Sequence, residues 1–158
     1  MRTLARLLCL VLAFAGAASP AVAGISLRVL QQEFSIGSMS FFNCFASTVS
    51  VNLEGSRWGT RFPILLNRLY KGGVTFAELP GLQKELTTIQ VELRKYPPSK
   101  VVWDIKRPGA LPPWGNNISP EITNLSNYFV TDDGKDLFGV LFHAISEAEH
   151  ARSPMNFE

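Results

Sequence analysis

The sequence predicts a single α+β domain in which a small β-sheet packs against about four helices, and three observations support this class. The chain has 158 residues, of which 46% are hydrophobic and 18% are charged, as expected for an ordinary globular domain. Strand-like and helix-like patterns follow one another in the order β-α-α-α-β-loop-β-α. No internal repeat or linker interrupts this order, so we expect one domain over residues 24–158.

The first 23 residues have the pattern of a secretory signal peptide. Arg2 and Arg6 precede an apolar run from Leu7 to Ala18, and Ala21-Val22-Ala23 offers a small-x-small cleavage site. The apolar run is shorter than the roughly 20 residues that a membrane-spanning helix needs. We therefore expect a periplasmic or secreted protein, cleaved near Ala23, that does not insert stably into a membrane.

Cleavage leaves a neutral domain with one cysteine. Removal of 23 of the 158 residues takes Arg2 and Arg6 away, so 13 of the 15 Lys and Arg residues remain against 13 Asp and Glu. A neutral domain lacks the positive field that attracts phosphates, so nucleic acid is not an expected partner. Cys9 belongs to the signal peptide, which leaves Cys44 unpaired and makes the apolar core the source of stability.

The N-terminal part of the domain predicts a strand followed by a helix. Apolar and polar residues alternate over Ile25–Gln31, which is typical of a half-buried strand. After a turn at Gly37, Ser40 can cap a helix over 41–54. Cys44 lies on its apolar side and is predicted to be a buried, inert thiol. Four polar residues share another face, which we expect to be solvated: Asn43, Ser47, Ser50 and Glu54.

Two further helices are predicted before the middle of the chain. Residues 62–70 form a short helical pattern with Pro63 in the first turn and Gly72-Gly73 at the end. The next helix ends where Pro97-Pro98 cannot continue it. Its apolar face contains Leu82, Leu86, Ile89, Leu93 and Tyr96. Its opposite face, predicted to be solvent-exposed, contains Lys84, Glu85, Gln90 and Lys95.

The C-terminal half predicts two strands separated by a long loop. Residues 100–105 and 126–131 are rich in β-branched and aromatic residues, and Trp103 is predicted to pack in the core as a structural residue. The Pro- and Gly-rich segment Lys106–Leu125 is a long loop, and loops of this length are usually functional or disordered. Apolar residues within it favour an ordered loop: Trp114, Ile118 and Ile122.

A final helix is predicted over 136–151, after a turn and cap at Asp132-Asp133-Gly134. Its buried face is expected to contain Leu137, Leu141, Ile145 and Ala148. His143, Glu147 and His150 share the opposite face. The two histidines lie two turns apart, unlike the ligands of HExxH, so a solvated polar face is expected and neither a metal nor a cofactor is predicted.

The sequence predicts no enzyme. No serine occupies a G-x-S-x-G elbow, and no glycine-rich loop has phosphate-binding form. A Cys44–His143 nucleophile pair is the strongest catalytic candidate. Apolar surroundings raise the pKa of a thiol rather than lowering it, so this pair is not favoured.

Several motifs along the chain together resemble a bacterial polymorphic-toxin immunity protein family. They are S-I-G-S at 35–38, S-F-F at 40–42, R-W-G-T-R-F-P at 57–63, Y-P-P-S-K-V-V-W-D-I at 96–105, P-P-W-G-N-N-I-S-P-E-I-T-N-L-S-N-Y-F-V-T at 112–131 and D-G-K-D-L-F at 133–138. The resemblance covers nearly all of residues 25–148. Its most specific part is the long string that begins at Pro112.

The resemblance implies a non-catalytic function, in which the protein binds a cognate protein toxin in a 1:1 complex and so protects its own cell. The predicted export signal places that encounter in the periplasm. The resemblance itself assigns no residue to the contact with the toxin.

The residues themselves suggest where a partner binds. The loop Lys106–Leu125 combines one aromatic residue with amides and a carboxylate, a mixture typical of a specific interface with a polar rim. Trp114 is either an anchor that docks the loop or part of the recognition surface. The predicted partner-binding set is Trp114, Asn116, Asn117, Glu121, Asp132 and Asp133. Trp58, Trp103 and Cys44 are predicted to be structural.

Two other classes of function remain open. An exported protein that binds a small ligand or an envelope component would use Trp58, Trp103 and Trp114 to line an aromatic cleft. A hydrolase or peptidase would use Cys44 or the histidines, and Cys44→Ser would then abolish its activity. A neighbouring toxin gene would favour the immunity function over both.

The signal-peptide assignment predicts that signal peptidase removes residues 1–23 and releases a soluble product. Mass spectrometry of the periplasmic fraction should find Gly24 at the N-terminus. An intact Met1, or protein found only in the membrane fraction, would contradict the assignment.

Overall fold

The computed structural model describes residues 24–158, and the predicted signal peptide lies outside the described residues. Within this range a four-stranded antiparallel sheet packs against three α-helices, which confirms the predicted α+β class. The strand order is β2-β1-β4-β3. The strands are β1 (Ile25–Val29), β2 (Gln32–Gly37), β3 (Gly73–Val74) and β4 (Met155–Phe157).

The predicted first strand is in fact the first half of a β-hairpin. β1 ends at Val29, and the two residues Leu30-Gln31 turn the chain into β2, so that Val29 pairs with Gln32 and Ile25 with Gly37. Leu30 adopts a left-handed conformation with φ of 54°. Two-residue hairpin turns of this kind usually carry Asn, Asp or Gly. A Leu-Gln turn gives no such signal, and β2 was therefore not predicted.

The C-terminal strand β4 was also not predicted. It lies between β1 and β3, with Leu27 paired to Phe157 and Val74 paired to Met155. Arg152 has a left-handed conformation that ends the last helix and turns the chain back toward the sheet. A three-residue strand is too short to display a clear alternating pattern.

The three α-helices are α1 (Met39–Leu53), α2 (Leu79–Leu93) and α3 (Leu137–Ala151). The predicted apolar faces of α2 and α3 are buried. Two predicted caps are corrected. Ser38 caps α1 in place of Ser40, because its Oγ accepts from the Phe41 amide at 3.1 Å. Asp136 caps α3, because its carboxylate accepts from the Gly139 amide at 2.8 Å.

Shorter helical turns join these elements: the π-helical turn η1 (Ile64–Arg68) and the 3₁₀ turns η2 (Leu69–Lys71), η3 (Phe76–Glu78) and η4 (Pro98–Lys100). The helix predicted over 62–70 therefore consists of η1 and η2. Glu85 of α2 accepts hydrogen bonds from the amides of Ile64 at 3.1 Å and Leu65 at 2.8 Å. Glu85 was predicted to face solvent, but it is half-buried because it satisfies the start of η1.

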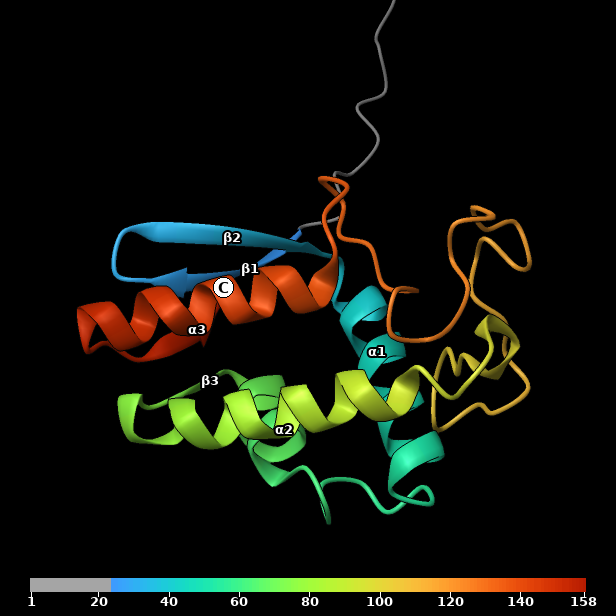
Figure 1. The fold of residues 1–158 in the computed structure, drawn as a ribbon, viewed down its shortest axis with the longest axis horizontal. Coiled ribbons are helices and arrows are strands. Elements are labelled where there is room, and N and C mark those ends of the chain that lie inside the picture. Colours follow the sequence, from blue (N-terminus) through green and yellow to red (C-terminus); the bar gives the residue numbers. More distant parts are fainter. Residues whose placement is uncertain (1–23) are drawn as a thin grey trace, which may run out of the picture.

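Figure 1 shows α2 and α3 side by side, with α3 running along β1 and β2. α1 crosses at one end of this pair, and the irregular segment 106–131 lies beyond α1. α1 is therefore a central helix, with the helices and sheet on one side and irregular chain on the other.

The two strands predicted in the C-terminal half do not form. The amides of Val102 and Ile105 bond to side chains of α1 instead of a neighbouring strand. Residues 126–131 contribute only an isolated bridge, between Val130 and Asp136. A β-branched and aromatic composition favours packing on a half-buried surface, but it does not specify a partner strand.

The polar residues of α1 are not solvated, in contrast to the prediction. Ser47 and Ser50 are fully buried, and Glu54 is 4% exposed. The reason is the central position of the helix, because irregular chain covers the side that would otherwise face water. A helix covered on both sides buries its polar face as well as its apolar face.

Glu54, the residue after α1, organises the chain that follows. Its two carboxylate oxygens accept hydrogen bonds from three backbone amides, those of Gly59 at 2.9 Å, Arg61 at 2.9 Å and Phe62 at 2.8 Å. These amides belong to an irregular turn and have no strand to pair with. One carboxylate thus satisfies the buried donors of a whole turn.

We predict that Glu54→Ala lowers the free energy of unfolding by about 3 kcal/mol or more, because three buried donors lose their acceptor. Glu54→Gln, which keeps one acceptor oxygen, should cost less than alanine. Urea denaturation measures both values. Glu121→Ala, at an exposed position, is the control and should change stability by less than about 0.5 kcal/mol; an equal cost at both positions would contradict the prediction.

Candidate functional site

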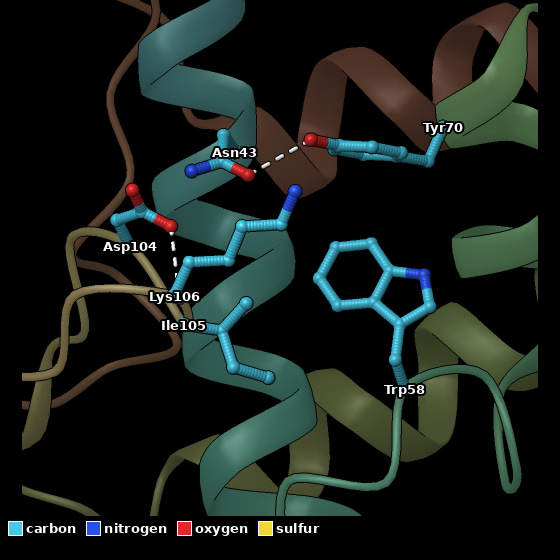
Figure 2. A pocket seen from close by; sticks show the side chains of 6 residues that line it. All are labelled: Asn43, Trp58, Tyr70, Asp104, Ile105 and Lys106. Carbon is cyan, nitrogen blue, oxygen red and sulfur yellow. Dashed lines mark hydrogen bonds between the residues drawn. The ribbon is translucent and has the colours of Figure 1, made fainter.

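A cleft of about 470 Å³ lies beside α1. Three segments far apart in the sequence form its walls: α1, the region from Trp58 to η2, and the segment around 104–106. Figure 2 shows the side chains that line it, which are Asn43, Trp58, Tyr70, Asp104, Ile105 and Lys106. We refer to this hollow as the α1 cleft.

Side chains of α1 hold one wall of the α1 cleft in place. Thr48 Oγ1 accepts from the Val102 amide at 3.0 Å and also contacts the Val102 carbonyl at 3.3 Å. Ser47 Oγ accepts from the Ile105 amide at 3.1 Å. Two hydroxyl groups one residue apart thus take the place of a neighbouring strand for this segment, which fixes the backbone that presents residues 104–106.

Trp58 forms the opposite wall. Its indole Nε1 donates to the Leu66 carbonyl at 3.1 Å, and its ring meets the ring of Tyr70 edge-to-face at 4.9 Å. Glu54 holds the turn from which Trp58 projects. Trp58 thus contacts both η1 and Tyr70, and its ring also lines the cleft.

Tyr70 and Asn43 meet across the α1 cleft. The Tyr70 hydroxyl donates to Asn43 Oδ1 at 2.8 Å (Figure 2). Asn43 Nδ2 in turn donates to the Trp103 carbonyl at 3.4 Å. Burial, together with the charge of Asp104, raises the pKa of Tyr70 above its usual value. The phenol thus keeps its proton at neutral pH and remains the donor in this pair.

The charges at the α1 cleft come from Asp104, Lys106 and Arg107. The Asp104 carboxylate accepts from the Lys106 amide at 3.0 Å and from Arg107 Nε at 3.0 Å. These donors lower the pKa of Asp104, so its carboxylate is charged at neutral pH. Asp104 is thus already partnered. The Lys106 side chain instead extends toward Tyr70 and Trp58, as Figure 2 shows.

A second hollow adjoins the α1 cleft, and a third is linked to the second through the contact of Trp103 with Trp114. The second, of about 270 Å³, shares Asn43, Tyr70 and Asp104 with it and is also lined by Trp103. The third, of about 250 Å³, is lined by Trp114 and Asn117. The rings of Trp103 and Trp114 contact edge-to-face at 5.6 Å. The three tryptophans therefore line three neighbouring hollows rather than one common cleft.

The loop Lys106–Leu125 is ordered, as predicted, and Trp114 anchors it. Trp114 Nε1 donates to the Tyr128 hydroxyl at 2.7 Å. Trp114, Ile118 and Ile122 are half-buried and pack against the core. Trp103 packs there too, although it is half-buried rather than central.

The predicted partner-binding residues fall in two regions. Asn116, Asn117 and Glu121 are exposed on the loop that Trp114 anchors. Asp132 and Asp133 are exposed in the turn before α3, where each already has a partner. Ser35 Oγ donates to Asp132 at 2.7 Å, and Lys135 Nζ pairs with Asp133 at 2.7 Å. The Asp133 turn lines a different hollow, near β2 and α3.

The sequence did not indicate the contributions of Asn43, Tyr70 and Lys106 to the α1 cleft. Asn43 was assigned to a solvated face, and Tyr70 ended a short helix. No periodic pattern links α1 to a segment sixty residues later along the chain. One feature of the sequence could have indicated these contacts: α1 combines several phenylalanines with many polar residues.

The catalytic alternatives gain no support from the geometry. Cys44 is fully buried, and burial raises the pKa of its thiol to about 12. His143 and Glu147 are exposed, and His143 Nε2 lies 3.7 Å from a Glu147 oxygen, which matches the predicted polar face. Within residues 24–158 no cluster of three His, Cys, Asp or Glu residues has metal-binding geometry. No helix in the same range combines the length and apolarity needed to cross a bilayer.

Comparison with known proteins gives one family match. The model of the family described as Immunity protein 70 matches residues 26–157. No curated protein and no solved structure matches the chain significantly. The family match extends from β1 to β4 and includes every residue that lines the α1 cleft.

Burial of Cys44 predicts that the thiol is structural. Cys44→Ala should lower the free energy of unfolding by about 1 kcal/mol, the cost of a small volume loss in a core. The native thiol should react with a thiol reagent only as fast as the protein unfolds. Rapid labelling of the native protein would contradict the burial, and a folded Cys44→Ala variant that lost function would support the nucleophile hypothesis.

Proposed function

The chain belongs to the Immunity protein 70 family, and we propose that it binds a cognate bacterial toxin and neutralises it without catalysis. The observation that carries the proposal is the family match over residues 26–157, which includes nearly all of the described domain. An immunity protein acts by stoichiometric binding, so its functional site is a surface of suitable shape and charge.

The ordered loop around Trp114 supports this surface role. The hydrogen bond to Tyr128 and the ring contact with Trp103 hold Trp114 from two sides. The backbone that carries Asn116 and Asn117 is therefore already ordered before a partner arrives. Preordering reduces the entropy lost on binding, and so favours a tight complex.

The exposed groups of the loop are suited to a specific polar contact. Asn116 and Asn117 present amides, and Glu121 presents a carboxylate that forms no hydrogen bond or ion pair within residues 24–158. The part of Trp114 that lines the third hollow, next to Asn117, offers an apolar contact. In the proposed complex Trp114 or Glu121 dominates the affinity, and Asp132 and Asp133 contribute at the edge.

The encounter takes place in the periplasm in this proposal, and the complex contains one copy of each protein. The basis for the location is the signal-peptide pattern of residues 1–23. A toxin that acts or arrives in the periplasm requires an immunity protein in the same compartment. The neighbouring open reading frame is the first candidate for the toxin gene.

A second candidate function rests on the α1 cleft. Its volume of about 470 Å³ lies in the roughly 300–1,000 Å³ range of small-molecule sites, and Trp58 and Tyr70 provide aromatic walls. An exported protein that binds a small ligand or an envelope component would use this cleft. Thermal stabilisation by a small molecule, combined with no binding to the neighbouring toxin, would favour this function.

Alanine substitution in the loop tests the proposed surface. The protein should co-purify with the product of the neighbouring toxin gene, and Trp114→Ala or Glu121→Ala should weaken the complex by about 2 kcal/mol or more, roughly thirtyfold in Kd. Asn116, Asn117, Asp132 and Asp133 complete the scan. Calorimetry measures the Kd values, and co-expression with the toxin measures protection of the cell.

Two controls make the scan interpretable. Thermal melts identify variants that lose the fold, which matters for Trp114 because it bonds to Tyr128. Ser146→Ala, on the exposed face of α3, should bind like the wild type. If all folded variants bind and protect like the wild type, the interface lies elsewhere, and if the wild type binds no toxin, the immunity function itself is wrong.

A further inference from the structure

The α1 cleft contains one cation without a partner. This cation is Lys106, which is exposed and whose side chain extends toward the rings of Tyr70 and Trp58 (Figure 2). Within residues 24–158 no carboxylate lies in ion-pair range of Lys106. The neighbouring acid, Asp104, is already paired with Arg107 and with the Lys106 amide.

The polar groups around Lys106 are otherwise satisfied. The Tyr70 hydroxyl and Asn43 bond to each other at 2.8 Å, and the Trp58 indole N–H donates to Leu66. The side chains that line the cleft are therefore held in place, and the ammonium group of Lys106 is the one polar group among them without a partner in the described chain. The complementary group is an anion that can accept hydrogen bonds from an ammonium group.

The walls of the cleft define the rest of the occupant. The rings of Trp58 and Tyr70 and the aliphatic Ile105 line the cleft beside Lys106, so an anion attached to an apolar stem is complementary to it. A glutamate or aspartate side chain has this composition. The adjoining hollow shares Asn43, Tyr70 and Asp104, so the concave surface continues past the cleft as it would for a segment of protein chain.

We propose that the α1 cleft receives an acidic side chain of the toxin, whose carboxylate pairs with Lys106 while its stem lies against the contacting rings of Trp58 and Tyr70. This inference rests on the proposed function and adds a second contact region to the loop around Trp114. The rings of Trp103 and Trp114 connect the two regions, because each lines a hollow on its own side of their contact.

A phosphate-bearing partner fits the same cleft less well. Recognition of phosphate usually involves several cations or backbone amides, whereas only Lys106 is unpaired here. The carboxylate of Asp104 also lines the cleft, and its repulsion, although reduced by Arg107, is greater for a group with two negative charges than for a carboxylate with one. Removal of residues 1–23 also leaves a domain without net charge.

Charge variants of Lys106 test the proposal. Lys106 forms no side-chain hydrogen bond within the described chain, so Lys106→Gln and Lys106→Glu should fold like the wild type, as thermal melts will check. Lys106→Gln should raise the Kd for the toxin roughly tenfold, and Lys106→Glu should raise it roughly a hundredfold or more because the reversed charge repels the carboxylate. The matched control is Lys84→Glu on the exposed side of α2, which should leave the Kd unchanged.

Two further measurements identify the occupant. Higher salt should weaken the wild-type complex more than the Lys106→Gln complex. The reason is that salt screens the ion pair of Lys106, which the Lys106→Gln complex lacks. Among toxin variants in which exposed Asp or Glu residues are changed to Lys one at a time, at least one should bind Lys106→Glu more tightly than it binds the wild type.

The outcomes separate the two proposals. The cleft does not receive an acidic side chain if the wild type binds the toxin and both Lys106 variants bind it as tightly as the wild type does. The same conclusion follows if no toxin substitution restores binding to Lys106→Glu. In both cases the proposed immunity function stands. If the wild type does not bind the toxin, the proposed function fails and this inference fails with it.

Discussion

The fold depends on hydrogen bonds from the polar side chains of one central helix to backbone that has no other partner. Thr48 and Ser47 satisfy the segment after η4, and Glu54 satisfies the turn that carries Trp58. An unpaired buried amide costs about 1–3 kcal/mol, which is more than the net contribution of a typical hydrogen bond. Irregular chain can cover α1 only because α1 supplies the missing acceptors.

The same arrangement produces the α1 cleft. Two of its walls are irregular segments that α1 holds, and the third is α1 itself, through Asn43. An irregular wall fixed by a few side-chain bonds keeps both its shape and an opening, which a recognition surface requires.

The sequence predicted the parts of the fold that local pattern controls. The apolar faces of α2 and α3, the ordered loop at Trp114 and the burial of Cys44 all follow from spacing or composition and are confirmed. The wrong predictions concern the groups with which each backbone segment pairs. The strand predicted over 100–105 does not form, because its amides bond to side chains of α1, and the Leu30-Gln31 turn lacks the residues that usually indicate a hairpin. The cleft was not predictable because its residues meet only through such nonlocal contacts.

The position of β4 has a consequence for how the protein folds. This strand occupies an interior place in the sheet, where it joins β1, the first element of the domain, to β3. Pairing across the whole length of a chain carries a large entropy of loop closure and slows folding. The β1–β2 hairpin and the helices involve contacts that are close along the chain, whereas β1 and β3 share a neighbour only when β4 pairs with both. Completion of the sheet is therefore expected to follow the formation of the hairpin and the helices.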